Sequence, residues 1–188
     1  MPDPAATSEP AAELKSVQAI LQAATFAAEK HAAQKRKGAA AEPYVNHLLE
    51  VAHLISTALS EPDTNLVIAA LLHDVIEDSG VTKDEVAERF GTDVADLVAE
   101  VTDDKALPKA ERKRLQIVNA PKKSVRAQVI KLADKISNLR AILHSPPAHW
   151  SLQRQREYVE WAKQVVDELS TPNPILKAEF DATYAKFN

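Results

Sequence analysis

Cysteine is absent from the 188-residue sequence, and glycine occurs only three times, as Gly38, Gly80 and Gly91. Without cysteine the chain forms neither disulfides nor thiolate metal sites, so a bound metal would need His, Asp or Glu ligands. Scarce glycine argues against a turn-rich sheet protein. Apolar residues make up 45% of the sequence, enough for one well-buried core at this length. We therefore expect a compact all-α protein, a single-domain helical bundle of about eight to ten helices.

Long apolar runs and an excess of positive charge are also missing. No run is long enough to cross a bilayer, and the first residues lack the pattern of a signal peptide, so we expect a cytoplasmic protein without a membrane segment. The formal net charge of −4 argues against nucleic-acid binding. Basic clusters at 35–37 and 109–114 nevertheless suit a small phosphorylated ligand. The sequence leaves the oligomeric state open, with a homo-oligomer among the alternatives.

The order of apolar residues and breakers predicts the helices. Residues 1–13, rich in Pro and Ala, predict a flexible N-terminal tail before a domain at 14–188. Apolar residues at helical spacing predict a first helix from about Leu14 to Gln34. Pro43 suits the first turn of a second helix, which Pro62 closes. Further helices are expected from about 63, at 82–91, 94–101, 109–121, 125–143, 151–169 and 174–187.

Ionisable residues terminate the most apolar helix, at His73-Asp74-Val75-Ile76-Glu77-Asp78. Burying such groups without partners costs several kcal/mol each, at roughly 2–7 kcal/mol for a polar group. A divalent cation removes much of that cost, because imidazole and carboxylate are both good ligands. Glu77 and Asp78 follow one turn later, where a carboxylate can orient water or move a proton.

Two residues cannot hold a catalytic ion, so further ligands must come from other helices. His47 lies at the start of the second helix, after Pro43-Tyr44-Val45-Asn46. Asp134 lies at the edge of an apolar stripe, with Asn138 one turn later on the same face. Both are candidates for the same site.

The segments that carry these residues, in this order, resemble the HD superfamily of metal-dependent phosphohydrolases. The resemblance is closer to small alarmone hydrolases and to the hydrolase half of RelA/SpoT enzymes. It covers about residues 26–161, and many relatives have proline where this chain has Leu48. The matching segments are Gln34-Lys35-Arg36-Lys37, Pro43-Tyr44-Val45-Asn46-His47, His73–Asp78, Val101–Lys105 and Lys131–Leu139.

The resemblance implies a manganese enzyme that releases pyrophosphate from (p)ppGpp by attack of a metal-bound water at the 3′ position. It implies the following roles: His47, His73, Asp74 and Asp134 as metal ligands; Glu77 and Asp78 as the catalytic acids that handle the water; and Arg36, Lys37, Asn138, Lys109, Arg154 and Tyr158 as substrate-binding residues.

Other interpretations stay open at this stage. The same chemistry could act on another nucleotide, such as a deoxynucleotide or the 2′-phosphate of NADPH. A degenerate HD domain that binds a nucleotide without catalysis is a third interpretation, although this chain keeps every ligand and both acids. His31, beside Gln34 in sequence, is expected to be a satisfied histidine next to the site rather than a ligand.

Overall fold

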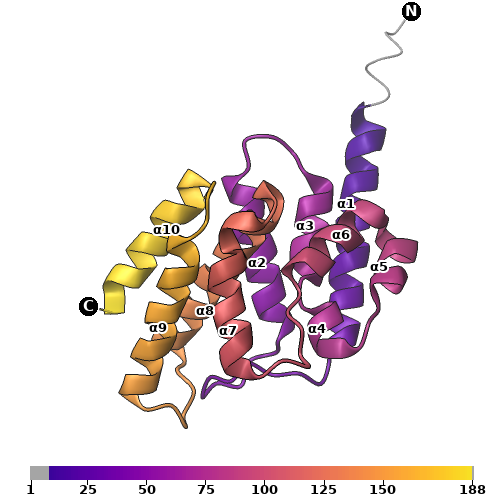
Figure 1. The fold of residues 1–188 in the computed structure, drawn as a ribbon. Coiled ribbons are helices and arrows are strands. Elements are labelled where there is room, and N and C mark those ends of the chain that lie inside the picture. The colour runs from indigo at the N-terminus through magenta and orange to yellow at the C-terminus, as the bar shows by residue number, and fades with distance from the viewer. Residues whose placement is uncertain (1–8, 188) are drawn as a thin grey trace, which may run out of the picture.

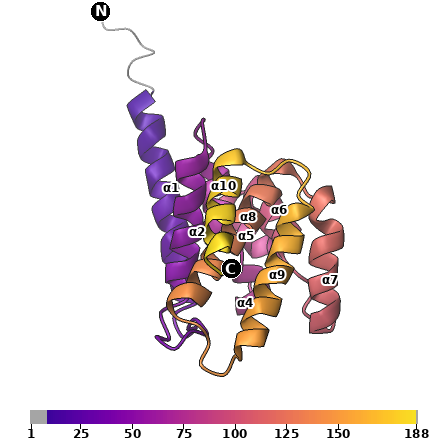
Figure 2. The ribbon, with the colours of Figure 1, turned by 90° about the vertical axis from the view of Figure 1, so that its left-hand side faces the viewer.

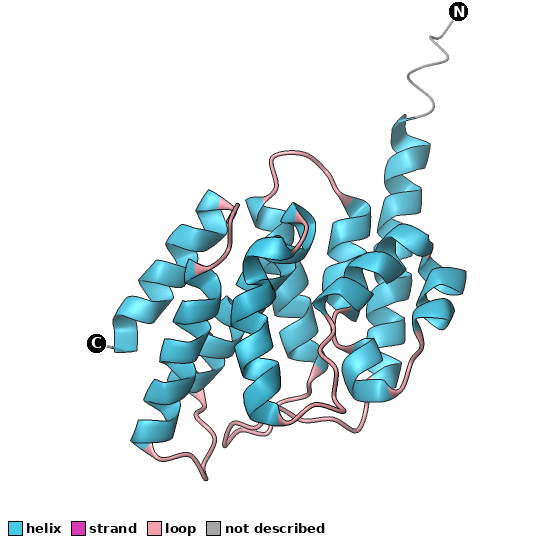
Figure 3. Ribbon diagram, viewed as in Figure 1, coloured by secondary structure: helices cyan, strands magenta, loops and turns pink. Residues whose placement is uncertain are grey.

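The computed structural model describes residues 9–187, which form helices α1 to α10 and two short 3₁₀ turns, without a named strand in that range. Figure 1 and Figure 3 show the helices stacked side by side in one body. This confirms the all-α prediction. The α-helices are α1 (Glu9–Lys30), α2 (Val45–Ala58), α3 (Thr64–Leu72), α4 (Val75–Ser79), α5 (Lys83–Phe90), α6 (Thr92–Val101), α7 (Lys109–Asn119), α8 (Val125–His144), α9 (Leu152–Asp167) and α10 (Pro174–Tyr184).

The core lies around α3 and α8. In α3, Leu66 and the run from Ile68 to Leu72 are buried, as the continuous apolar sequence predicts. The twenty-residue α8 is buried along most of its length and packs against α2, α3, α6, α9 and α10. Helix α8 therefore contributes residues both to the core and to the wall of the cavity described below. No helix in the described part of the chain is both long and apolar enough to span a bilayer.

Helix ends follow local capping chemistry in several places. The side chain of Thr82 accepts a hydrogen bond from the Glu85 amide over 3.1 Å, as its predicted capping box requires. Asp63 caps α3 in the same way through the Leu66 amide, over 2.9 Å. Gly80, with φ of 73°, ends α4 in the left-handed region.

Three predicted boundaries need correction. Helix α1 begins at Glu9, so residues 9–13 of the predicted tail are helical, because alanine and glutamate favour helix and Pro10 fits a first turn. Residues 1–8 of that tail lie outside the described range. Pro43 precedes α2, which begins at Val45, and its backbone instead forms an isolated bridge with Lys35. The first turns of α1 project beyond the other helices (Figure 2).

The third correction concerns the predicted third helix, which stops at Leu72. His73 and Asp74 form the junction between α3 and the short α4, which begins at Val75. Loops after α1, α6 and α8 gather at the same end of the molecule as α4 (Figure 3). This end holds the candidate site.

Candidate active site

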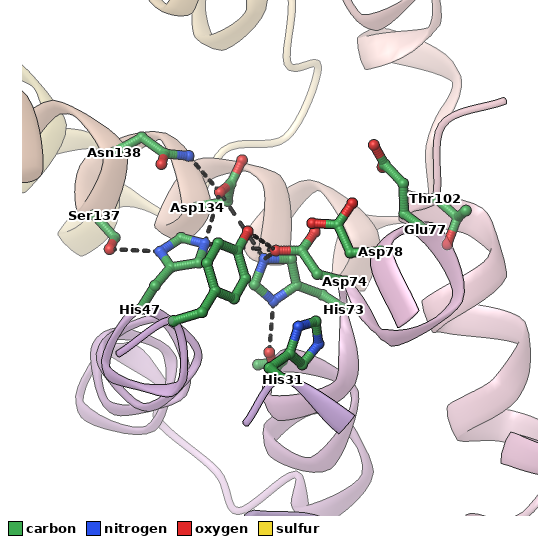
Figure 4. Close-up of polar contacts among 12 residues, drawn as sticks. His31, His47, His73, Asp74, Glu77, Asp78, Thr102, Asp134, Ser137 and Asn138 are labelled. Carbon is green, nitrogen blue, oxygen red and sulfur yellow. Dashed lines mark hydrogen bonds and ion pairs between the residues drawn. The ribbon is translucent and has the colours of Figure 1, made fainter. Parts of the chain in front are cut away.

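Side chains from α2, α8 and the α3–α4 junction converge at one point (Figure 4). One ligand atom each from His47, His73 and Asp134 lie within 4.8 Å of one another. Asp74 joins them, with its Oδ2 3.1 Å from His73 Nε2 and 3.8 Å from His47 Nε2. His47 Nε2 lies 3.3 Å from Asp134 Oδ1. The structure thus brings together all four residues that the sequence suggested as ligands.

Hydrogen bonds on the far side of each imidazole fix its tautomer. His73 Nδ1 donates to the Ala70 carbonyl over 2.7 Å. His47 Nδ1 lies 2.8 Å from Ser137 Oγ, and that hydroxyl donates to Glu50 over 2.6 Å. Because the Ser137 hydroxyl donates its one hydrogen to Glu50, its oxygen must accept a hydrogen bond from His47 Nδ1. In the neutral form of each ring, Nε2 therefore carries a lone pair that faces the convergence point.

The donor set fits a divalent cation. His73 Nε2 is buried and has no hydrogen-bond partner, which is costly unless another group occupies its lone pair. Two imidazole nitrogens and two carboxylates suit borderline and hard divalent ions, and hydrogen bonds behind the ligands are typical of metal sites. His47, His73, Asp74 and Asp134 could hold such an ion.

The charges at this cluster act strongly on one another. Burial opposes charge on His73, yet the Asp74 and Asp134 carboxylates outweigh it and raise its pKa to about 9. Burial would raise the pKa of Asp74, but the imidazoles of His73 and His47 hold it well below its ordinary value. Burial lowers the pKa of His47. Unlike charges thus stabilise both carboxylates in their ionised form.

Asp134 is also held from outside the cluster. Lys135 Nζ donates to its Oδ2 over 2.9 Å, and Asn138 Nδ2 donates to its Oδ1 over 2.6 Å. Burial raises the pKa of Asp134, but Lys135 and His47 lower it well below the ordinary value. Arg36 in turn donates to Asn138 Oδ1 over 3.0 Å. A chain of contacts therefore connects the first basic cluster to the metal-binding candidates.

Glu77 and Asp78 lie on α4, on the cavity side of the cluster. Glu77 accepts from the Asp103 amide over 3.2 Å and lies 3.5 Å from Arg112, and burial raises its pKa. Asp78 accepts from Gln34 over 3.0 Å and forms an ion pair with Lys105. The two acids thus have different surroundings, although they are adjacent in sequence.

A cavity of about 500 Å³ opens in front of these acids. Its opposite wall is basic: burial, followed by the charge of Arg154, lowers the pKa of both Lys109 and Lys113. Tyr158 packs between Trp150 and Trp161, with ring centroids 5.6 and 5.2 Å away. Such a wall suits a ligand with several phosphates and a planar base. All of the predicted site residues line this cavity except His47, which lies behind it.

Sequence reasoning missed several side chains that the structure adds to the site. Tyr44 donates to Asp74 over 2.7 Å, and burial together with Asp74 raises its pKa far above the ordinary value, so it stays a donor. Lys135 and Ser137 support Asp134 and His47, respectively. Tyr44 and Lys135 lie inside the segments that carry the family resemblance, which was the available signal. Ser137 lies in the same segment as Lys135, Lys131–Leu139, and shows no other signal.

A family model described as "HD domain" matches residues 23–165. The chain belongs to the HD domain family. In sequence it is 50% identical over 162 residues to "Guanosine-3′,5′-bis(diphosphate) 3′-pyrophosphohydrolase MESH1" of Xenopus tropicalis, a match that covers 86% of this chain and 90% of that protein. The human protein of the same name is 49% identical over 154 residues, covering 82% and 86%, respectively.

A solved structure has the same fold as this chain. It is described as "A metazoan ortholog of SpoT hydrolyzes ppGpp and plays a role in starvation responses" and is 45% identical. The match covers 89% of this chain and 94% of the other, with a TM-score of 0.86. The predicted resemblance to the HD superfamily and its alarmone hydrolases is therefore confirmed.

Proposed function

We propose that this HD domain hydrolyses guanosine 3′,5′-bis(diphosphate) at its 3′ diphosphate, yielding GDP and pyrophosphate. The observation that carries the proposal is the meeting of His47, His73 and Asp134 beside Glu77 and Asp78 at the edge of a basic cavity. The names of the relatives at about half identity support the same substrate. A cytoplasmic enzyme with a small-molecule partner fits this proposal.

We infer that His47, His73, Asp74 and Asp134 hold one manganese ion. Such an ion, when bound, would supply Lewis-acid polarisation of a phosphoryl oxygen and would acidify water. Tyr44, Ser137 and Lys135 keep these side chains oriented from behind. Both imidazoles present Nε2 towards the carboxylates, and each would bind the ion in its neutral form.

Glu77 and Asp78 carry the proton transfers in this proposal. The oxygen of a water molecule bonds to the phosphorus next to the ribose, and the bond from that phosphorus to O3′ breaks. One carboxyl group takes the proton of the water, and the other gives a proton to O3′. Lys109 and Arg154 lie on the cavity wall where negative phosphate charge would collect.

Residues on the remaining wall would hold the nucleoside. Arg36 and Lys37 would flank the guanine and ribose, Asn138 would lie beside the ribose and its phosphate, and Tyr158 would contact the substrate from α9. All four line the cavity. Their contacts limit the ways in which a nucleotide can place its 3′ phosphorus near α4.

A nucleotide panel tests the proposal. Purified protein with manganese should convert ppGpp to GDP and pyrophosphate, and His73→Ala should abolish the conversion. His53→Ala, which changes an exposed histidine of α2, is the matched control. If ppGpp stays intact while NADPH or a deoxynucleotide is consumed, the proposed substrate is contradicted. If no nucleotide is consumed, catalysis is contradicted.

A further inference from the structure

Asp78 accepts a hydrogen bond at each of its two carboxylate oxygens. Gln34 Nε2 donates to Oδ2 over 3.0 Å, and the Lys105 ammonium contacts Oδ1. A donor at each oxygen still leaves a second lone pair on that oxygen, which can take a proton from water. This arrangement suits a carboxylate that receives a proton rather than a carboxylic acid that gives one.

His31 decides which way the Gln34 amide faces. His31 Nδ1 lies 2.6 Å from Gln34 Oε1. An amide oxygen only accepts, so the hydrogen of the imidazole must be on Nδ1. With its oxygen held by His31, the amide of Gln34 can only turn its NH₂ group towards Asp78.

The position of His31 is fixed by packing. The imidazole is buried and stacks on the ring of Tyr44, with centroids 5.2 Å apart and an interplanar angle of 26°. Its Nε2 is buried without a hydrogen-bond partner in the described chain, which agrees with an unprotonated nitrogen at that position. His31 is therefore a half-satisfied histidine, whereas the sequence suggested a fully satisfied one.

The second acid, Glu77, also has a donor near each oxygen, but its contacts are longer than the 3.0 Å between Gln34 and Asp78. Glu77 receives its contacts from the Asp103 amide and, over 3.5 Å, from Arg112. Glu77 is half-buried, and burial raises its pKa, which favours a protonated carboxyl group. The two neighbouring acids are thus prepared for opposite halves of a proton transfer.

We propose that Gln34, oriented by His31, is a positioning residue that fixes Asp78 as the proton acceptor of the hydrolysis and leaves Glu77 as the donor. This assignment rests on the proposed function. The attacking water passes one proton to Asp78 as its oxygen bonds to phosphorus. The ribose O3′ takes the proton of Glu77 as its bond to phosphorus breaks, and solvent then restores both carboxyl groups.

Gln34→Glu tests this chain of contacts from His31 through Gln34 to Asp78, called the relay below, with almost no change of side-chain shape. Glutamate still accepts from His31 but faces Asp78 with an acceptor in place of a donor. We expect kcat to fall about ten- to a hundredfold, with KM and Mn²⁺ affinity within about twofold. The acidic limb of the pH profile of kcat should move to higher pH, because facing carboxylates raise each other's pKa. Lys105, whose ammonium also contacts Asp78, is unchanged in this variant.

Two further variants separate positioning from folding. Gln18→Glu makes the same chemical change on an exposed face of α1 and should leave kcat and the pH profile unchanged. His31→Asn keeps a donor close to the place of Nδ1 and should retain most of kcat, whereas His31→Leu should lose it. Circular dichroism and Mn²⁺ titration check that each variant folds and binds metal.

Several outcomes would overturn the relay. One is a Gln34→Glu enzyme with unaltered kcat and pH profile, and another is a parallel loss of kcat and Mn²⁺ affinity. Hydrolysis of a different nucleotide would overturn only the proposed substrate, and the same variants would then be compared on that nucleotide. If the wild-type protein hydrolyses nothing, the proposed function and the role of Asp78 as proton acceptor both fail. Imidazole nitrogen NMR tests the orientation of Gln34 separately: hydrogen on Nδ1 of His31 supports it, and hydrogen on Nε2 refutes it.

Discussion

His47 and His73 are both buried imidazoles at one site, yet their surroundings act on their charge in opposite directions. Burial lowers the pKa of His47, whereas nearby carboxylates raise that of His73 to about 9 despite its burial. The same hydrogen-bond logic nevertheless leaves Nε2 of each ring facing Asp74 and Asp134. Tautomer, rather than position alone, makes these residues a plausible ligand pair.

The two acids of α4 can be tested by removing their charge without removing their volume. Glu77→Gln and Asp78→Asn should each lower kcat by about a hundredfold or more, since a positioned acid or base contributes about 10²–10⁴. Mn²⁺ affinity should stay close to wild type, because neither side chain is among the four ligand candidates. Full turnover in the double variant would contradict their assignment.

Ser137 should control metal affinity without touching the metal. Ser137→Ala removes the acceptor that holds His47 Nδ1, so Mn²⁺ affinity should fall about 10- to 100-fold. Electron paramagnetic resonance of free Mn²⁺ measures this directly. Ser56→Ala, at an exposed position of α2, is the control. Equal affinities in the two variants would show that the hydroxyl does not orient His47.

Lys113 should give substrate binding a dependence on alkaline pH. Burial and the charge of Arg154 lower its pKa below the usual 10.5, so it loses its charge at a lower pH than a free lysine does. KM for an anionic nucleotide should therefore rise as pH rises towards 10. Lys113→Arg should flatten this rise, because arginine stays charged. Lys122→Arg, at an exposed position, should not.

At the scale of helices, the junction between α3 and α4 explains how two adjacent residues share one site. In a continuous helix, neighbouring side chains point about 100° apart. The structure ends α3 at Leu72 and begins α4 at Val75, and between them Asp74, with φ of −106° and ψ of −2°, departs from regular helix geometry. Their Nε2 and Oδ2 atoms approach to 3.1 Å.

Local sequence predicts most helices but not this junction. Thr82, Asp63 and Gly91 mark ends through their own chemistry, which acts within a few residues. Residues 73 and 74 carry no breaker, and only distant partners make the interruption favourable. The contact between His47 and Ser137 likewise joins positions 90 residues apart, beyond the reach of periodicity.

The loop after α1 depends on the absence of a side chain at Gly38. A Cβ atom there would lie 2.2 Å from the Ser145 carbonyl oxygen. Gly38→Ala should therefore displace the loop that carries Arg36 and Lys37 and raise KM severalfold, with a loss of stability of about 1–3 kcal/mol. Gly80→Ala is the contrasting variant, because its Cβ meets nothing within 4 Å. Its left-handed backbone should cost about 1 kcal/mol of stability, but no loop is displaced and KM should be unchanged. Thermal unfolding and steady-state kinetics distinguish the two.

At the scale of the whole molecule, metal binding should add to folding stability. The cluster gathers buried carboxylates and imidazoles from separate helices, and an ion that binds only the folded state stabilises it by mass action. At a hundred times its Kd, Mn²⁺ should add about 2.7 kcal/mol. The melting temperature should rise with Mn²⁺ and fall on chelation. His73→Ala should abolish this response, and an unchanged response would exclude these ligands.

Composition and periodicity are sufficient to predict the all-α fold, because helix formers and apolar spacing act along the whole chain. They also place His47 on the inward side of its helix or beside it, and Asp134 at the edge of an apolar stripe. The family resemblance, rather than spacing, selected Arg154 and Tyr158 from a helix far along the sequence. Relative positions across the cavity depend on tertiary packing, which neither periodicity nor capping describes.

Backbone hydrogen bonds join the two loops at the mouth of the cavity, where the Ala39 amide donates to the Pro146 carbonyl and the Ala40 amide to Ser145 Oγ. Dissolved ions screen attraction between charges over about 8 Å at 0.15 M ionic strength, but they act weakly on neutral contacts of this kind. Raising the salt concentration would therefore reduce the capture of a polyphosphate while the entrance keeps its form. Ionic strength at this entrance therefore affects the affinity for the polyphosphate but not the hydrogen bonds that hold the two loops together.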